Sequence, residues 1–308
     1  MSKSSDENNN TTVARPIHTI AVLGAGTMGH GIAQVAAMAS YAVIMCDVNA
    51  DALARGVQSI ERNLAKAIQL KKFSDQDRDE TLRRVQCATG LEEISRVDLV
   101  IEAAPENLEL KQNLLRETEA LVADDCVFAT NTSSLSIGEV AAASSRPENV
   151  VGMHFFNPVH IMRLVEIVVS KQTSHEATAT VREVATRMNK EPIIVRDVPG
   201  FASSRLGVTL GLEAMRMVEQ GVASARDIDT AMELGYNHPM GPLRLTDLVG
   251  LDVRLHIAEY LHGKLGSEAF RPPDILRRMV SEGKLGKKSG EGFYKWNEQE
   301  TGQRAYTT

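Results

Sequence analysis

The sequence has 308 residues, of which 43% are hydrophobic and 24% charged, values typical of a globular protein with one large or two medium domains. A formal net charge of −6 argues against a nucleic-acid binder that depends on bulk positive charge, and no apolar run approaches the roughly 18 residues of a membrane span. Three cysteines, Cys46, Cys87 and Cys126, lack the spacing of a disulfide framework or a zinc site, so we expect buried thiols in a reducing compartment and no metal.

The first 15 residues are polar and rich in Asn and Ser, without the apolar segment that a secretory signal contains. We therefore expect residues 1–15 to be a disordered tail and the protein to be cytoplasmic. The ordered part of the chain is expected to begin at residue 16.

The first strong feature is an apolar run at 19–23 that ends in Gly24-Ala-Gly26-Thr-Met-Gly29, after which a helical pattern begins at His30. A G-x-G-x-x-G motif between a strand and a helix is typical of dinucleotide binding. Gly24 allows a tight turn, Gly26 lets the backbone approach a pyrophosphate, and Gly29 lets the helix pack closely on the strand. The N-terminus of the helix would offer free N–H groups and a partial positive charge to the phosphates.

A second apolar run, residues 42–46, ends at Asp47, which lies 18 residues beyond Gly29, near the position expected for an acid that binds the adenosine ribose. No arginine follows Asp47 directly, and a carboxylate would repel a 2′-phosphate, so the pattern favours NAD over NADP. The alternative is an ordinary strand–turn–helix in which Asp47 only caps the next helix. The presence of both the motif and the acid favours the dinucleotide interpretation.

A long helical pattern follows over residues 53–68, and a shorter helix is predicted from Gln76 to about Arg84. These helices could form a plain crossover, but they are longer than a crossover requires, which indicates an arm that projects from the sheet. Strands are then predicted at 85–88, 98–103 and 126–130, with a helix at about 107–122.

Four small polar residues, Asn131-Thr132-Ser133-Ser134, follow the strand at 126–130. Ligands bind at the carboxyl ends of strands in open α/β sheets, so this tetrad is a candidate site. A helix cap is the equally weighted alternative.

The next two predicted strands carry titratable side chains. His154 lies near the end of the run at 150–156, and Glu166 interrupts the apolar run at 164–169. Burying an unpaired carboxylate is costly, so Glu166 needs either a cation or a position facing solvent. His154 is the natural partner, and an edge strand with Glu166 in water is the alternative.

A helix at about 174–189 and a strand at 192–195 complete the alternating pattern, which predicts a doubly wound, mainly parallel Rossmann-type sheet over residues 16–197. Beyond Pro199 the pattern becomes helical without a clear strand. We expect an all-helical domain over residues 198–308, with helices at about 202–220, 224–235, 243–261 and 273–281.

Seven stretches, matched in order and spacing, carry a resemblance to a known family: Gly24-Ala-Gly-Thr-Met-Gly29, Asn131-Thr-Ser-Ser-Leu135, His154-Phe-Phe-Asn-Pro158, Leu164-Val-Glu166, Pro199-Gly-Phe201, Met240-Gly-Pro242 and Gly286-Lys-Lys-Ser-Gly-Glu-Gly-Phe-Tyr294. The chain resembles the short-chain L-3-hydroxyacyl-CoA dehydrogenases, including 3-hydroxybutyryl-CoA dehydrogenases, from about residue 17 to residue 296. The resemblance implies an NAD-dependent oxidoreductase of fatty acid or butanoate metabolism, with an acyl-CoA substrate and a homodimer formed through the helical domain.

The resemblance also implies roles for individual residues. His154 would be the general base that takes the proton of the 3-hydroxyl, Glu166 would orient it, and Ser133 would hydrogen-bond near the reacting oxygen and the nicotinamide. Lys71, and less clearly Asn63, would contact CoA from the helical arm. The NAD contacts would be Gly24, Ala25, Gly26, Thr27, Met28, Gly29, Asp47, Glu106, Lys111, Ser133, Asn157 and Lys288.

One position departs from the family. Where members commonly have a substrate-binding Asn after Pro-Gly-Phe, this chain has Ser204, whose shorter side chain would lengthen or lose a hydrogen bond worth about 0.5–1.5 kcal/mol. This substitution bears on efficiency and substrate preference more than on reaction class. Two rival functions remain at this stage: a dehydrogenase of a free hydroxy acid or sugar acid, and a non-catalytic NAD-binding or structural protein.

Overall fold

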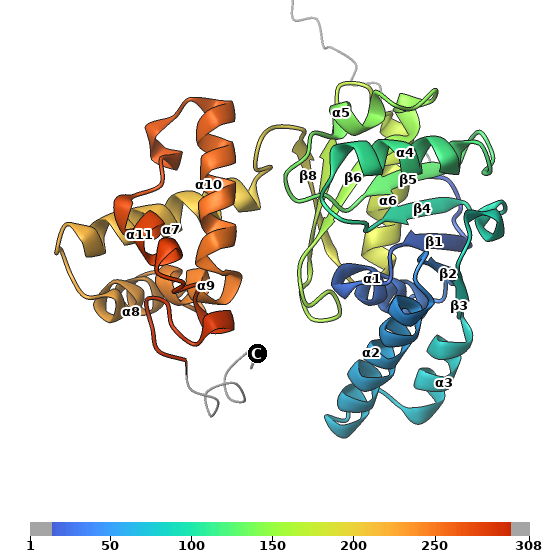
Figure 1. Cartoon of the computed structure of the whole chain (residues 1–308). Coiled ribbons are helices and arrows are strands. Elements are labelled where there is room, and N and C mark those ends of the chain that lie inside the picture. Colours follow the sequence, from blue (N-terminus) through green and yellow to red (C-terminus); the bar gives the residue numbers. More distant parts are fainter. Residues whose placement is uncertain (1–13, 297–308) are drawn as a thin grey trace, which may run out of the picture. The chain divides into compact units, whose positions relative to one another are not determined.

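A computed structural model describes residues 14–296 and divides the chain into two compact units between Val198 and Pro199 (Figure 1). The predicted tail lies outside the described residues up to residue 13. Arg15, which the prediction assigned to the tail, is instead held by a 2.6 Å ion pair with Glu176 and by hydrogen bonds to Thr180 and to the carbonyl of Asp125.

The first unit contains an eight-stranded sheet with the order β3-β2-β1-β4-β5-β6-β7-β8. All neighbouring strands pair in parallel except β6 and β7, which are antiparallel. The strands are β1 Thr19–Leu23, β2 Ala42–Cys46, β3 Val85–Ala88, β4 Leu99–Glu102, β5 Val127–Thr130, β6 Val150–Phe155, β7 Leu164–Val169 and β8 Glu191–Arg196. The doubly wound, mainly parallel sheet is therefore confirmed.

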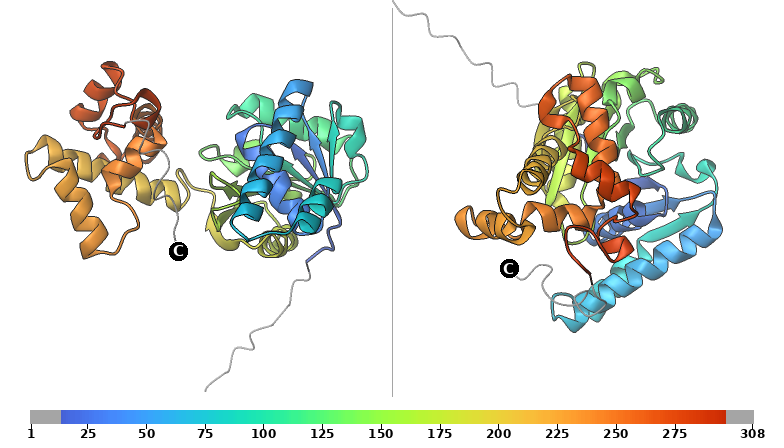
Figure 2. Two further views of the ribbon diagram at one scale, coloured as in Figure 1. Left: turned by 90° about the horizontal axis from the view of Figure 1, so that it is seen from below. Right: turned by 60° about the vertical axis from the view of Figure 1, so that its left-hand side comes forward.

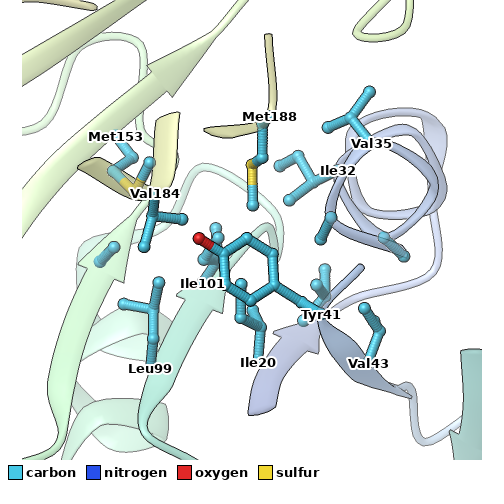
Figure 3. Packing of buried hydrophobic residues seen from close by; sticks show 14 of the residues in the cluster. Ile20, Ile32, Val35, Tyr41, Val43, Leu99, Ile101, Met153, Val184 and Met188 are labelled. Carbon is cyan, nitrogen blue, oxygen red and sulfur yellow. The ribbon is translucent and has the colours of Figure 1, made fainter. Parts of the chain in front are cut away.

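Helices cover both faces of this sheet, as a parallel sheet with apolar strands requires. Helices α1 and α6 lie on one face, where Tyr41 packs among apolar side chains of both helices and of the central strands (Figure 3). Helices α4 and α5 cover the other face (Figure 1). The helices are α1 Thr27–Met38, α2 Ala50–Gln69, α3 Asp75–Arg83, α4 Leu108–Glu119, α5 Ile137–Ala141 and α6 His175–Arg187.

Helices α2 and α3 extend away from the strands (Figures 1 and 2). The buried residues of α2 end at Leu64, and the last turn, up to Gln69, is part-exposed or exposed. The pair is thus anchored at one end and projects at the other.

Cys46 and Cys126 are buried, and burial raises the pKa of each thiol to about 12, which makes both unreactive. Cys87 is exposed, so the prediction that all three cysteines are buried is wrong for this one. It lies on β3, which pairs only with β2 and therefore forms an edge of the sheet.

The second unit is helical, with α7 Ser203–Glu219, α8 Ala225–Gly235, α9 Pro242–Val249, α10 Leu251–Leu265 and α11 Asp274–Ser281. The prediction of one helix over 243–261 is wrong, because α9 and α10 are separate helices. Gly250 divides them with φ +103°, a backbone conformation that only glycine adopts without strain. Within residues 14–296, no helix has the length and apolarity required to cross a membrane.

Asp247 of α9 fastens the segment that follows α11. Its carboxylate accepts hydrogen bonds from the backbone N–H groups of Phe293 and Tyr294 at 2.9 Å and from the Trp296 indole at 2.8 Å. Burial raises the pKa of Asp247, against the opposing effect of these donors. The closing segment of the unit therefore depends on one buried acid.

Replacing this acid tests that dependence. Asp247→Ala is expected to lower the free energy of unfolding by roughly 1–3 kcal/mol for each donor left buried without a partner. Because Trp296 is the single tryptophan of the chain, its emission should shift to the red as the segment loosens. Asp274→Ala, which removes an exposed acid from α11, should leave both the emission and the melting temperature unchanged. Unchanged emission in Asp247→Ala would contradict this role.

Candidate active site

The carboxyl ends of the parallel strands meet at one edge of the sheet. Leu23 of β1 is in register with Cys46 of β2 and with Glu102 of β4, and Glu102 is in register with Thr130 of β5. The glycine motif, Asp47 and the 131–134 tetrad follow these strand ends directly. Ligands bind at such an edge in open α/β sheets, so the fold brings the predicted groups to the expected place.

Each glycine of the motif meets a different environment. Gly24 has φ +104°, and a Cβ there would approach the carbonyl oxygen of Ala103 to 2.7 Å. A Cβ on Gly29 would lie only 1.8 Å from the carbonyl oxygen of Gly24, so the helix crosses the strand end too closely for any side chain. A Cβ on Gly26 would meet no atom within 4 Å. The open space at Gly26, at the N-terminus of α1, fits a phosphate group held by backbone N–H groups.

Asp47 is part-buried at the end of β2. Its Oδ2 accepts a hydrogen bond from the backbone N–H of Ala25 at 2.9 Å, and its Oδ1 accepts one from Asn49 at 2.9 Å. The carboxylate therefore fixes the glycine loop to the second strand, while Asn49, not Asp47, caps α2. The capping alternative is wrong for Asp47.

Glu106 connects the loop after β4 to the 131–134 tetrad. Its Oε1 accepts hydrogen bonds from the Thr132 hydroxyl at 2.6 Å, from the Ser133 N–H at 2.9 Å and from the Ser134 N–H at 3.0 Å. Burial alone would raise the pKa of Glu106, but these donors and the charge of Lys111 lower it. Thr132, Ser133 and Ser134 thus bind the Glu106 carboxylate and favour its ionised form. The Ser133 residue itself remains exposed.

Lys111 has no exposed side-chain surface. Its ammonium donates to both oxygens of Glu102, at 2.7 and 2.9 Å, and lies 3.6 Å from Glu106. The Thr130 hydroxyl donates to Glu102 at 2.6 Å. The buried charge of Lys111 therefore acts on the exposed part of the site through Glu106. Glu102 was not predicted as a site residue, although it is, like Glu166, an acid in an apolar run.

His154 and Glu166 face each other across the antiparallel pair of β6 and β7. The His154 Nδ1 and the Glu166 Oε2 are 2.8 Å apart, with the histidine 6% and the glutamate 0% exposed. Strand β7 lies between β6 and β8, so the alternative of an edge strand with Glu166 in water is wrong. With Nδ1–H directed at the carboxylate, Nε2 is the nitrogen that can accept a proton.

The segment after β6 is held from two sides. Asn131 accepts a hydrogen bond from the Phe155 N–H through Oδ1 at 2.9 Å, which joins the ends of β5 and β6. Lys190, nearly buried, donates to the carbonyl oxygens of Val159 and Met162, and burial lowers its pKa to about 8. Asn157, between these anchors, is exposed. No sequence signal marked Lys190.

The remaining predicted residues lie elsewhere. Asn63 is on α2, where its amide donates to Gln34 at 3.0 Å, and the exposed Lys71 follows the end of that helix. Ser204 and Lys288 belong to the second unit. Ser204 is part-exposed in the first turn of α7, and Lys288 donates to Asp252 at 2.6 Å.

Comparison with known proteins identifies the two units separately. Residues 19–198 match the family described as 3-hydroxyacyl-CoA dehydrogenase, NAD binding domain. Residues 200–296 match 3-hydroxyacyl-CoA dehydrogenase, C-terminal domain. The open cradle at Gly26 agrees with the nucleotide that the first of these families binds.

Relatives match over nearly the whole chain. A probable 3-hydroxybutyryl-CoA dehydrogenase of Deinococcus radiodurans is 44% identical over 89% of this chain and 99% of its own. The 3-hydroxybutyryl-CoA dehydrogenase of Clostridioides difficile is 40% identical over 90% and 99%. The crystal structure of (S)-3-hydroxybutyryl-CoA dehydrogenase PaaH1 from Ralstonia eutropha superposes with a TM-score of 0.89 at 39% identity, covering 92% of this chain and 100% of that one.

The glycine motif provides a matched pair of variants. Gly26→Ala should keep the melting temperature but weaken NADH binding about tenfold or more, because its methyl group enters the open cradle. Gly29→Ala should destabilise the first unit, because its Cβ would overlap the carbonyl of Gly24. Thermal melting and NADH titration measure both effects. Full NADH affinity in a folded Gly26→Ala protein would show that the cradle is not the nucleotide site.

Proposed function

The chain belongs to the 3-hydroxyacyl-CoA dehydrogenase family, and on that premise we propose that it oxidises an (S)-3-hydroxyacyl-CoA to the 3-oxoacyl-CoA with reduction of NAD. The buried His154–Glu166 pair at the ligand-binding edge of the sheet is the observation that carries this proposal. A short acyl group such as 3-hydroxybutyryl is the substrate that the names of the relatives support.

NAD, when bound, supplies the acceptor for the hydride that leaves C3 of the substrate. The residues proposed to hold it are Gly24, Ala25, Gly26, Thr27, Met28, Gly29, Asp47, Glu106, Lys111, Ser133, Asn157 and Lys288. Lys111 would act by positioning Glu106, since its own side chain is buried. The backbone N–H groups at the start of α1 would bind phosphate, and Asp47 would favour a free ribose 2′-hydroxyl over a 2′-phosphate.

His154 would remove the proton of the 3-hydroxyl through Nε2 as the C3–H bond breaks. Glu166 would hold the ring in the required tautomer and stabilise the imidazolium that forms, as the acid does in other His–carboxylate pairs. Because both side chains are buried, their mutual attraction is weakly screened by solvent. General base catalysis of this kind contributes roughly 10²–10⁴-fold to the rate.

The substrate contacts are proposed from both units. Ser133 would hydrogen-bond near the reacting oxygen, Asn63 and Lys71 would contact CoA from the projecting arm, and Ser204 would provide a short hydroxyl donor on α7. Retention of Ser133, His154 and Glu166 together disfavours a non-catalytic protein. A dehydrogenase of free hydroxy acids is disfavoured by the match of both units to the acyl-CoA family.

Assembly and location are proposed on separate grounds. The second unit exposes several large apolar side chains, including Leu206 at 72%, Leu234 at 83% and Tyr236 at 75%. Exposed apolar side chains of this size are often covered in protein interfaces, which supports a homodimer formed through this unit. The three cysteines are free thiols, which supports a reducing, cytoplasmic location.

Replacing the proposed base tests the chemistry. His154→Ala should lower kcat for acetoacetyl-CoA-dependent NADH oxidation by roughly 10²–10⁴-fold and leave the Kd of NADH nearly unchanged. His175→Ala, an exposed histidine at the start of α6, is the matched control and should keep wild-type kcat. Wild-type turnover by His154→Ala would refute the assignment of the base.

The cofactor preference tests the role of Asp47. The wild-type protein should oxidise NADH and discriminate against NADPH in the presence of acetoacetyl-CoA. Asp47→Asn removes the charge and one of the two oxygens that accept from the Ala25 and Asn49 N–H groups, so the ratio of kcat/KM for NADH to that for NADPH should fall about tenfold or more. An unchanged ratio would show that another group selects the nucleotide. Absence of turnover with either cofactor, in a protein that binds NADH, would contradict the proposed function itself.

A further inference from the structure

The connection between β6 and β7, residues 156–163, joins the strand of the proposed base to the strand of its acid. His154 is paired with Glu166, and a single further residue pair of the ladder lies between them and the connection. Phe156, the first residue of the connection, also contacts the base directly, with its ring centroid 4.6 Å from that of the His154 imidazole. The conformation of the connection therefore bears on the position of both side chains.

Lys190 holds this connection from the turn between α6 and β8. Its ammonium donates to the carbonyl oxygen of Val159 and to that of Met162, the latter at 2.9 Å. The two carbonyls lie three residues apart, so one group bridges two points of the connection. An ammonium has three N–H donors and no acceptor, which suits it to join carbonyl groups. Lys190 therefore fixes the middle of the connection from a distant part of the chain.

The opposite side of the same segment packs on α1. Val159 is 2% exposed, and a Cβ on Gly31 would approach the Val159 Cβ to 2.8 Å. The absence of a side chain at Gly31 thus lets the connection lie directly against the helix. Val159 is held by packing through its side chain and by Lys190 through its carbonyl, so the ammonium supplies the polar half of the attachment.

The charge of Lys190 has no acidic partner in residues 14–296. Glu191, the next residue, is exposed and lies 3.7 Å from Arg163 instead. His160, the titratable group of the connection that faces Lys190, does not offset the charge, because burial and the charge of Lys190 both lower its pKa. Burial lowers the pKa of Lys190 itself to about 8. A buried charge without an acid costs stability at neutral pH, which points to a use other than stability.

We propose that Lys190 is a positioning residue for the reaction: by fixing the connection between β6 and β7, its ammonium aligns His154 with Glu166. The inference rests on the proposed function, in which His154 is the base. Lys190 touches neither side chain of the pair in this account and acts only through the backbone that joins their strands. A small displacement of a catalytic group by a distant change is sufficient to lower a rate by up to about 10²-fold.

The first test separates turnover from cofactor binding. Lys190→Met removes the ammonium and keeps an unbranched side chain, and kcat for acetoacetyl-CoA-dependent NADH oxidation should fall about tenfold to 10²-fold. The Kd of NADH should change less than about twofold, because the glycine loop and Asp47 lie outside the connection. Lys171→Met, an exposed lysine two residues after β7, is the matched control and should keep both values.

The second test observes the pair without any substrate. The His154 Nδ1 proton, hydrogen-bonded to Glu166, should give a downfield proton resonance that is absent in His154→Ala. This resonance should shift or broaden in Lys190→Met and stay in place in Lys171→Met. A lysine that only stabilises the fold would change the melting temperature and leave the resonance where it is.

The outcomes separate the inference from the function beneath it. A wild-type kcat or an unmoved resonance in folded Lys190→Met overturns the inference and leaves the dehydrogenase function standing. If the wild-type protein does not turn over acetoacetyl-CoA or longer 3-oxoacyl-CoA thioesters, the proposed function fails, and the resonance alone decides whether Lys190 aligns the pair. If Lys190→Met does not fold, Lys190→Gln, which is neutral but keeps a polar end, gives the same two readings.

Discussion

The structure of the site depends on one hydrogen-bonded pair, His154 and Glu166, placed inside a sheet. Glu166 has no exposed surface, and a carboxylate in such a position is stable only beside a cation or a strong donor. Strand β7 runs antiparallel to β6, which places Glu166 directly opposite His154. The His154 Nδ1 and the Glu166 Oε2 form a hydrogen bond of 2.8 Å. The single antiparallel pairing in the sheet is thus what creates the pair.

The same pairing sets where His154 lies along the sheet. Thr130 at the end of β5 is in register with Gly152 of β6. Strand β6 continues past this point, so His154 lies two residues beyond the end of β5. The glycine loop, Glu106 and Ser133 follow the ends of the parallel strands at this edge. The proposed base, the acid proposed to orient it and, apart from Lys288, the groups proposed to hold the nucleotide therefore all belong to the unit that contains this sheet.

Local patterns in the sequence were sufficient for much of this arrangement. Glycines between a strand and a helix have few other uses, and the three different environments of Gly24, Gly26 and Gly29 agree with the roles assigned to them. An acid in an apolar strand demands a partner, and that reasoning led to His154. Boundaries set by a single backbone angle were harder to predict: the pattern at 243–261 is continuous in hydrophobicity, and only the conformation of Gly250 divides it.

Contacts between distant residues were not accessible from the sequence. The anchoring of Arg15 by Glu176, the exposure of Cys87 at a sheet edge, and the burial of Lys111 against Glu102 depend on which elements become neighbours. Lys190 and Arg254 lie in ordinary contexts along the chain, and only their burial makes them unusual. Tertiary packing, not local propensity, determines these features.

The most direct test of the central claim is the single-turnover rate of NADH oxidation by Glu166→Gln at saturating acetoacetyl-CoA. Gln preserves the volume of the side chain and can still accept a hydrogen bond, but it cannot stabilise an imidazolium by charge. We expect a rate lower than wild type by roughly 10²-fold or more, with unchanged NADH affinity and melting temperature. A wild-type rate in this variant would show that the buried pair supports the fold alone and takes no part in the reaction.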